Sequence, residues 1–425
     1  MSILSLALRN LLYRPWTTAL SLLLAALGAG LISLILLLNW QLEQQFDRNL
    51  AGINLVVGAK GSPLQLMMSS MYHISSPTGN VPLDKVKPFL NPAHPYISLG
   101  VPLSLGDSYR GRRIVGTRPT FLQLYGAELS EGAMWTAPMD VVAGASAARE
   151  LGLQLGDTFR SSHGLVEDDD LTHRDAPPFR VVGILGPTGT VADLVLLTPT
   201  ESLWAVHDTH DTHDATAQHD DHDHDTGPAH APAYDVTQPL MDYTDKIITS
   251  VLIQFKGNSI TALNMQRSIN ENTEMQAVTP SIQLAELYAT VGQGEQVLRQ
   301  LGYVVVGVSI LSIFIGLYSS LDRRRGELAL LRSLGAGPSK LFGLLLMEGT
   351  FTAVAGALLG LLLSHAGLAL IARYFSQAYR YDFQRLVFLP EEYWLLAGAV
   401  VVGVLAASVP AWRAARTDVH RTLAQ

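Results

Sequence analysis

Histidine and aspartate fill one stretch of the chain, which reads HDTHDTHDATAQHDDHDHD at residues 207–225 and contains no apolar residue larger than alanine. Neutral imidazole and carboxylate are both ligands of Zn²⁺, Ni²⁺ and Cu²⁺. The composition therefore predicts a metal-binding segment. Its candidate ligands are seven histidines: His207, His210, His213, His219, His222, His224 and His230.

The spacing of these histidines is irregular, which argues against one rigid tetrahedral site and favours several interchangeable sites of modest affinity. Few apolar groups are available to offset the entropy of ordering, so we expect a loop that is disordered when free. The alternative is a solvated acidic linker whose histidines bind nothing. Mild acid would weaken metal binding, because histidine is a ligand only as the neutral ring.

The remainder of the chain has the composition of a membrane protein. Of its 425 residues 48% are hydrophobic and only 16% charged, and the mean hydropathy is +0.22. About 20 apolar residues in a helix cross the hydrocarbon of a bilayer. Four stretches are long enough, at residues 19–40, 301–321, 344–371 and 393–409.

Lysine and arginine near the ends of these stretches predict the orientation. All ten lie on one side if both termini are cytoplasmic: Arg9, Arg14, Arg323, Arg324, Arg325, Arg332, Lys340, Arg413, Arg416 and Arg421. The first stretch is too long for a cleavable signal peptide and is expected to remain as an anchor. The net charge of −8 is concentrated in the exported region and argues against a nucleic-acid partner.

This topology divides the chain into a large exported region and short connections. In the exported region short strands alternate with turns and helices, so a mixed α+β domain is expected. The predicted segments are a cytoplasmic N-terminus with the first membrane helix (1–40), the periplasmic domain with its histidine-rich insertion at 207–230 (41–300), membrane helix 2 (301–321), a cytoplasmic helix (322–340), membrane helix 3 (341–372), a short periplasmic loop (373–392), membrane helix 4 (393–412) and a cytoplasmic tail (413–425).

The cytoplasmic segment DRRRGELALLRSLGAGPSK, residues 322–340, combines arginines with leucines on one helical face. Taken by itself it fits an interfacial helix that only fixes topology. However, RRRGELALLRSLGAGPSKLFGLLLMEG resembles the signature of the FtsX-like permeases of ABC transporters, the family that includes the MacB efflux permease and the lipoprotein-releasing permeases. The exported segments GTRPTFLQLYGAELSEGAMWTAPMDVVAGASAARELGLQLGDTFR and FRVVGILGPTGTVADLVLLTPTESLW resemble the periplasmic core of the same family.

The resemblance implies an α-helical membrane protein with four transmembrane helices and a large mixed α+β extracytoplasmic domain. In this domain a second lobe would be inserted into a porter-like lobe between about residues 116 and 242. The cytoplasmic segment would be a coupling helix that docks on an ATPase. The docking candidates are Arg324, Arg325, Glu327, Leu331, Arg332, Leu334 and Gly335.

The chain has no Gly-Lys dipeptide and hence no P-loop, so it is not expected to be an enzyme or to bind a catalytic cofactor. ATP would act only through a partner ATPase subunit. The family also implies a second permease copy. Small residues at four-residue spacing let membrane helices approach closely and could form the contact between the two copies. The candidates for a helix interface are Ala26, Gly30, Gly356 and Gly360.

Two ionisable residues fall inside the third stretch. Glu348 is expected near the inner interface, where pairing with a basic residue would explain it. His365 is expected near the outer end of the same stretch, and a metal or proton role is the less favoured interpretation.

The sequence thus predicts a permease subunit of the bacterial inner membrane that works by mechanotransmission and is linked through the histidine-rich segment to the homeostasis of zinc or another transition metal. Two alternatives remain: a lipoprotein-releasing or efflux permease with an incidental linker, and a metal-responsive scaffold without transport. A periplasmic or lipoprotein partner is expected in addition to the ATPase. The transported substrate is not indicated.

Overall fold

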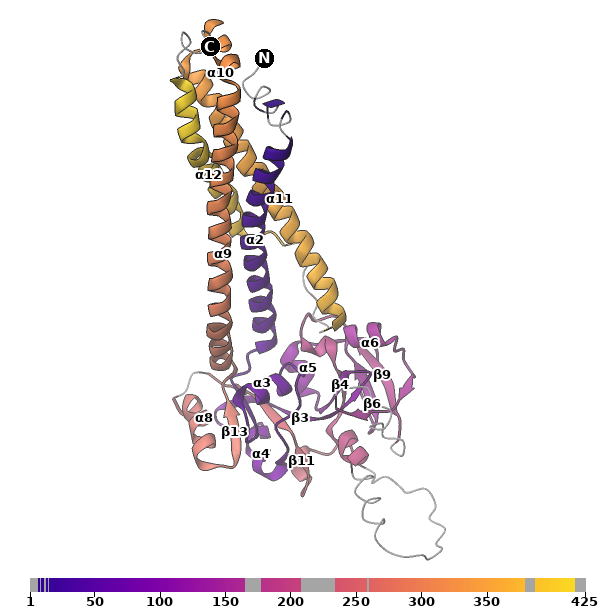
Figure 1. Ribbon diagram of the computed structural model, residues 1–425. Helices are drawn as coiled ribbons and strands as arrows, with labels where there is room; N and C mark the ends of the chain where they lie inside the picture. The colour runs from indigo at the N-terminus through magenta and orange to yellow at the C-terminus, as the bar shows by residue number, and fades with distance from the viewer. Residues whose placement is uncertain are drawn as a thin grey trace, which may run out of the picture. The chain divides into compact units, whose positions relative to one another are not determined.

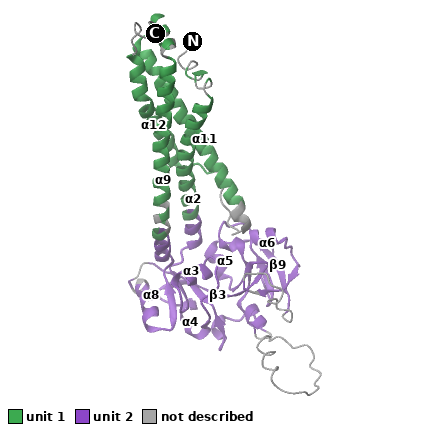
Figure 2. Ribbon diagram, in the orientation of Figure 1, with its two compact units in different colours: residues 1–43, 289–425 green, residues 44–288 purple. Residues whose placement is uncertain are grey.

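The computed structural model describes residues 7, 9–10, 13, 15–164, 177–207, 234–257, 260–378 and 387–416. It divides into two compact units (Figures 1 and 2). The first, Met1–Glu43 with Ala289–Gln425, is called the membrane unit below; the second, Gln44–Tyr288, is called the sheet unit. Two helices, α2 (Pro15–Leu50) and α9 (Pro280–Arg323), contribute residues to both units.

The membrane unit contains the apolar parts of α2 and α9, together with α11 (Pro338–Ala378) and α12 (Pro390–Ala415). Each of these four helices is long and apolar enough to cross a membrane, with a mean hydropathy of 2.1 to 2.6 in its most apolar window. Even α12, with 26 residues, extends about 39 Å at 1.5 Å per residue, which exceeds the hydrocarbon thickness of about 30 Å. The short helix α10 (Arg325–Ser333) lies between α9 and α11 in sequence.

Glycine and alanine bring the membrane helices into backbone contact. A Cβ added at Gly360 of α11 would lie 2.5 Å from the carbonyl oxygen of Ala26 on α2. One at Gly403 of α12 would lie 2.5 Å from Cα of Thr350 on α11. Because lipid removes the hydrophobic drive between helices, van der Waals contact at such small residues is a main source of their association.

The sheet unit is built around an eleven-stranded sheet. Nine strands follow in the order β13-β1-β12-β3-β4-β10-β6-β9-β5, while β7 pairs with β9 and β8 pairs with β3. The strands are β1 (Leu55–Ala59), β3 (Ile97–Tyr109), β4 (Arg112–Thr117), β5 (Leu129–Gly132), β6 (Asp140–Ala143), β7 (Thr158–Phe159), β8 (Ser162–His163), β9 (Phe179–Leu185), β10 (Leu196–Pro199), β12 (Ser250–Phe255) and β13 (Met275–Val278). A separate pair joins β2 (Val81–Pro82) and β11 (Ile247–Ile248).

The long strand β3 belongs to two parts of this sheet. Its first half pairs with β12, from Ile97 to Leu103, and its second half pairs with β4, from Ser104 to Tyr109. The strands β4 to β10 therefore form one continuous insertion between β3 and β12. Helices α3 (Pro63–Ser70), α4 (Leu83–Leu90), α5 (Thr120–Tyr125), α6 (Ala145–Leu151) and α8 (Ile260–Asn272) complete the α+β arrangement expected from the sequence.

Candidate functional site

The short helix α10 has a buried side and an exposed side. Leu328 is buried in a cluster with Leu321, Leu341 and Leu345 of α9 and α11. By contrast, Leu330 is 56% exposed and Leu334, directly after the helix, is 77% exposed. Residues four apart on a helix are neighbours, so these two leucines form one apolar patch. Exposed leucines at this spacing are available for contact with another protein.

The residues expected to bind an ATPase have different positions around α10. Leu334 and Gly335 are exposed, and Gly335 has a φ of 93°, which glycine adopts without strain. Arg332 is half-buried, and the Arg324 side chain is only 14% exposed. The side chains of Arg325, Glu327 and Leu331 lie outside the described part of the structure.

Leu330 was absent from the predicted docking residues. Its spacing of four from Leu334 was the available signal. In the sequence, four neighbouring leucines form one apolar face. The sequence does not show that Leu328 is buried against other helices whereas Leu330 is exposed.

Arg324 faces a buried carboxylate on α11. Its Nη1 lies 4.0 Å from Oε1 of Glu348, which is 3% exposed. The same Oε1 accepts a hydrogen bond of 2.6 Å from Nδ2 of Asn10. The basic partner expected for Glu348 is therefore Arg324. A buried charge is tolerated when it is paired and hydrogen-bonded, as here.

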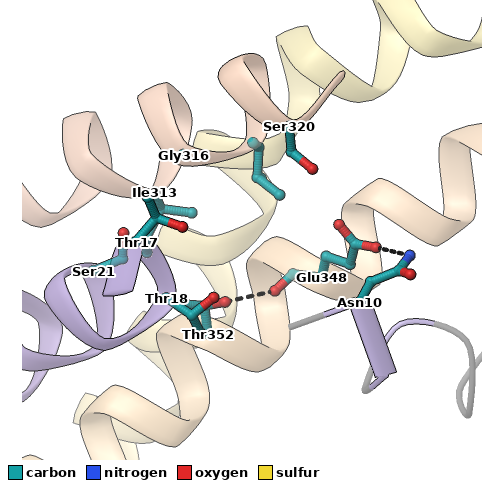
Figure 3. A pocket seen from close by; sticks show the side chains of 10 residues that line it. Asn10, Thr17, Thr18, Ser21, Ile313, Gly316, Ser320, Glu348 and Thr352 are labelled. Atoms are coloured by element: carbon teal, nitrogen blue, oxygen red, sulfur yellow. Dashed lines mark hydrogen bonds between the residues drawn. The ribbon is translucent and has the colours of Figure 1, made fainter. Parts of the chain in front are cut away.

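Glu348 borders a polar pocket of about 40 Å³ (Figure 3). Thr352 donates a hydrogen bond of 2.8 Å to the carbonyl oxygen of Glu348, and Ser21 and Ser312 share one of 3.0 Å. Hydroxyl groups from three helices thus line the same pocket as this carboxylate. The lining residues are Asn10, Thr17, Thr18, Ser21, Ile313, Gly316, Leu317, Ser320, Glu348 and Thr352.

The four small residues expected at a helix interface contact one another within the chain. A Cβ at Gly356 would lie 2.4 Å from Cβ of Ala25 and 3.4 Å from the nitrogen of Ala26. One at Gly360 would lie 2.8 Å from the nitrogen of Gly30. These residues are therefore occupied by the contact between α2 and α11. A contact between two copies of the chain stays a prediction that needs other residues.

Of the seven histidines proposed as metal ligands, only His207 lies within the described residues. Its Nε2 is 3.7 Å from Oδ1 of Asp107, whose other oxygen accepts a hydrogen bond of 3.1 Å from Ser161. His210, His213, His219, His222, His224 and His230 lie outside the described residues. Among the residues that are described, no three histidine, aspartate or glutamate side chains gather as a metal site.

The residues that flank this segment contact one another. The rings of Trp204 and Tyr234 have centroids 5.9 Å apart, and Lys246 donates a hydrogen bond of 2.6 Å to the Tyr234 hydroxyl. Arg118 donates to the backbone carbonyls of residues 236 and 238 and forms an ion pair with the buried Glu201. The described residues on either side of the segment therefore lie close together.

The charges beneath this place are partly buried. Burial raises the pKa of the Glu201 carboxyl, and the neighbouring Arg118 guanidinium opposes that rise. Elsewhere in the sheet unit, burial and then the charge of Arg113 lower the pKa of His73 to about 3.

Two protein families match the chain. The family described as FtsX-like permease C-terminal matches residues 301–419, and the MacB-like periplasmic core domain matches residues 18–225. No curated protein matches. One similar solved structure is the periplasmic region of MacB from Actinobacillus actinomycetemcomitans, with 12% identity and a TM-score of 0.32, covering 56% of this chain and 94% of that one. Another is the extracellular domain of the noncanonic ABC-type transporter YknZ from Gram-positive bacteria, with 10% identity and a TM-score of 0.29, covering 53% and 100%.

Proposed function

Because the chain belongs to the ABC transporter permeases that combine an FtsX-like domain with a MacB-like periplasmic core, we propose that it works by mechanotransmission with a separate ATPase subunit. Both termini and α10 would face the cytoplasm of a bacterium, and the sheet unit would face the periplasm. Two copies would provide two α10 helices for two ATPase subunits. ATP would be hydrolysed by the partner alone.

The apolar patch of Leu330 and Leu334 is the observation that carries this proposal. A separate ATPase would cover these leucines, which are exposed at the one short helix between two membrane helices. Arg324 would not bind the ATPase directly, because its side chain faces Glu348. It would instead connect α10 to α11.

Motion would then spread through contacts already described. Leu328 fixes α10 in the apolar cluster of α9 and α11, so a displacement of α10 acts on both helices. Through its contact with α11, α2 would follow. Since α2 and α9 each have residues in both units, they are the segments that would carry this motion toward the exported domain. The substrate need not pass through the membrane.

Replacing both exposed leucines tests the docking. We expect Leu330→Asp with Leu334→Asp to abolish co-purification of the ATPase and its stimulation in proteoliposomes. Leu155→Asp is the matched control, because Leu155 is 45% exposed but lies in the sheet unit. Undiminished ATPase binding by the double variant would contradict docking through this patch.

The histidine-rich segment supports a link to zinc. Its composition offers imidazole and carboxylate ligands, and the contact between Trp204 and Tyr234 allows a short linker to replace residues 208–233 without moving either flank. We expect the full chain to bind more than one zinc ion in titration calorimetry. The variant with a Gly-Ser linker should lose this binding. Equal zinc binding by both proteins would show that the segment is a linker without a role in metal binding.

An apolar cavity favours a second candidate, extraction or efflux of apolar cargo. It has a volume of about 200 Å³ and lies among α2, α9, α11 and α12, next to Ala29, Tyr303, Ala357 and Trp394. Such a space would accept an acyl chain or a small apolar molecule. A brominated fatty acid should then quench Trp394 fluorescence, and Ala357→Leu should remove this quenching. Unquenched wild-type Trp394 would contradict this candidate.

A metal-responsive scaffold without transport is the third interpretation. It predicts zinc binding without any ATPase that co-purifies. The docking experiment above therefore also separates it from the two transport functions.

A further inference from the structure

His365 on α11 directs both of its ring nitrogens at backbone carbonyls. Nδ1 lies 2.9 Å from the oxygen of Leu361, and Nε2 lies 3.1 Å from the oxygen of Val387. A carbonyl oxygen only accepts hydrogen bonds, whereas a neutral imidazole has a single N–H. Both contacts are hydrogen bonds only when the ring carries two protons and a positive charge. The side chain is 11% exposed, so water is a poor substitute for either carbonyl.

A buried carboxylate balances this charge. Oε2 of Glu392 on α12 lies 3.8 Å from Nε2 of His365 and accepts a hydrogen bond of 3.2 Å from the nitrogen of Leu389. Its Oε1 accepts one of 2.8 Å from the hydroxyl of Ser33 on α2. Glu392 is 2% exposed. A carboxylate so buried needs a nearby positive charge or strong donors, and it has both.

The apolar parts of α2 and α11 add no other ionisable group to this pair, whereas the sequence between them and α12 carries Arg373, Arg380, Asp382 and Arg385. Residues 15–42 of α2 contain no ionisable side chain, and His365 is the only one between residues 349 and 372. Glu391, the neighbour of Glu392, is exposed. Phe388 stacks on the His365 ring with centroids 4.7 Å apart, and an aromatic face attracts a cation.

We propose that His365 and Glu392 form a proton-binding site at the end of the membrane unit where α11 is connected to α12. With the proton bound, three segments are held together at this site. The ring donates to the carbonyl of Val387 in the connection, it pairs with Glu392 of α12, and Glu392 accepts a hydrogen bond from Ser33 of α2. Ser33 also shares a hydrogen bond of 2.8 Å with Ser364, the residue before His365.

Loss of this proton changes one hydrogen bond into a contact between two acceptors. The bond to Leu361 lies within one helical turn, whereas the bond to Val387 joins α11 to the connection. The neutral ring keeps a single proton, and whichever nitrogen holds it, the pairing with Glu392 loses its positive charge. A rise in pH therefore loosens residues 387–389 from α11. This site is independent of ATPase docking and of zinc.

Nitrogen NMR of the full chain, labelled with ¹⁵N-histidine in detergent, tests the protonation directly. Comparison with His365→Gln assigns the signal, and His420→Gln is the control, since His420 is the other histidine of residues 289–425. At pH 7 we expect the signal lost in His365→Gln to have two protonated ring nitrogens. A neutral single tautomer at that pH would overturn the proposal.

A conformational measurement tests the consequence. The chain contains no cysteine, so a spin label at Glu391→Cys reports on α12 alone. We expect its mobility to rise at least twofold between pH 5.5 and 8.5, and to stay constant with pH when His365→Gln is added. If the mobility of the label changed with pH equally with and without His365, the protonated His365 ring would not be what holds α12 in place, and the proposal would be refuted.

Discussion

Arg324 and Glu348, which lie on either side of α10 in the sequence, meet in the structure with Nη1 and Oε1 4.0 Å apart. The arginine precedes α10 and the glutamate lies in the third turn of α11. The contact joins the segment proposed to receive force from an ATPase to the first part of the next membrane helix. Its contribution can be measured separately from docking.

A double-mutant cycle measures the coupling between these two residues. Glu348→Gln removes the carboxylate that faces Arg324, and we expect it to lower the free energy of unfolding in detergent by roughly 3 kcal/mol. Arg324→Gln with Glu348→Gln should cost less than the sum of the single variants by about 1–3 kcal/mol. Glu391→Gln, at an exposed position, is the control. Additive effects would show that the pair has no energetic coupling.

Gly360→Ala should destabilise the contact between α2 and α11 by about 1–3 kcal/mol, because the added Cβ would lie 2.5 Å from backbone oxygen of Ala26. Gly367→Ala on the same helix is the matched control, since no atom lies within 4 Å of a Cβ there. That control should be neutral or stabilising by up to about 1 kcal/mol, the difference in helix propensity. Thermal unfolding in detergent distinguishes the two variants, and equal midpoints would contradict the close helix contact.

The low pKa of His73 predicts that the fold loses stability in acid. Its pKa falls from 6.5 to about 3 in the fold, so below pH 6.5 the unfolded chain binds a proton that the folded chain does not. Between pH 6.5 and 4.5 the free energy of unfolding should decrease by roughly 2–3 kcal/mol from this group.

The variant His73→Asn should remove this part of the acid sensitivity. Asparagine tolerates the backbone φ of 56° at this position better than most residues. His94→Asn, at a partly exposed position, is measured alongside it as a second histidine variant. If the pH profiles of wild type and His73→Asn were parallel, the ring would already be protonated or solvated in the fold.

Zinc binding by the histidine-rich segment should itself depend on pH. Protons compete with the metal for each imidazole, so we expect affinity to fall at least tenfold between pH 7.5 and 5.5. The variant with a linker in place of residues 208–233 provides the baseline in the same calorimetric titration. Zinc binding that is insensitive to pH would point to carboxylate ligands instead of histidine.

Much of the fold follows from the sequence because its signals are local. Long apolar stretches predicted four membrane helices, and alternating short strands and turns predicted an α+β domain. Strand β3 was not anticipated, since its 13 residues satisfy two different sets of partners. Only the assembled sheet shows where one set ends.

The polar contacts of the membrane unit were largely beyond sequence analysis. Asn10 and Glu348 are 338 residues apart, and Ser33 and Glu392 are 359 apart. No periodicity relates positions so distant. The small residues Gly356 and Gly360 were predicted to lie between two copies of the chain, whereas in the structure they contact α2 of the same chain; their spacing does not say which helix they meet. Glu348 was singled out by its charge, although Asn10 carried no such signal.

The glycine contact between α11 and α2 also limits how these helices can move. Gly30 and Gly360 lie backbone to backbone, with a distance of 2.9 Å between a Cβ built at Gly30 and the Gly360 oxygen. Sliding by one residue would bring larger side chains into that space, so translation along the axis is blocked while pivoting about the glycines remains open. Pivoting about these glycines, which lie near the middle of their apolar stretches, would displace the two ends of one helix in opposite directions relative to the other.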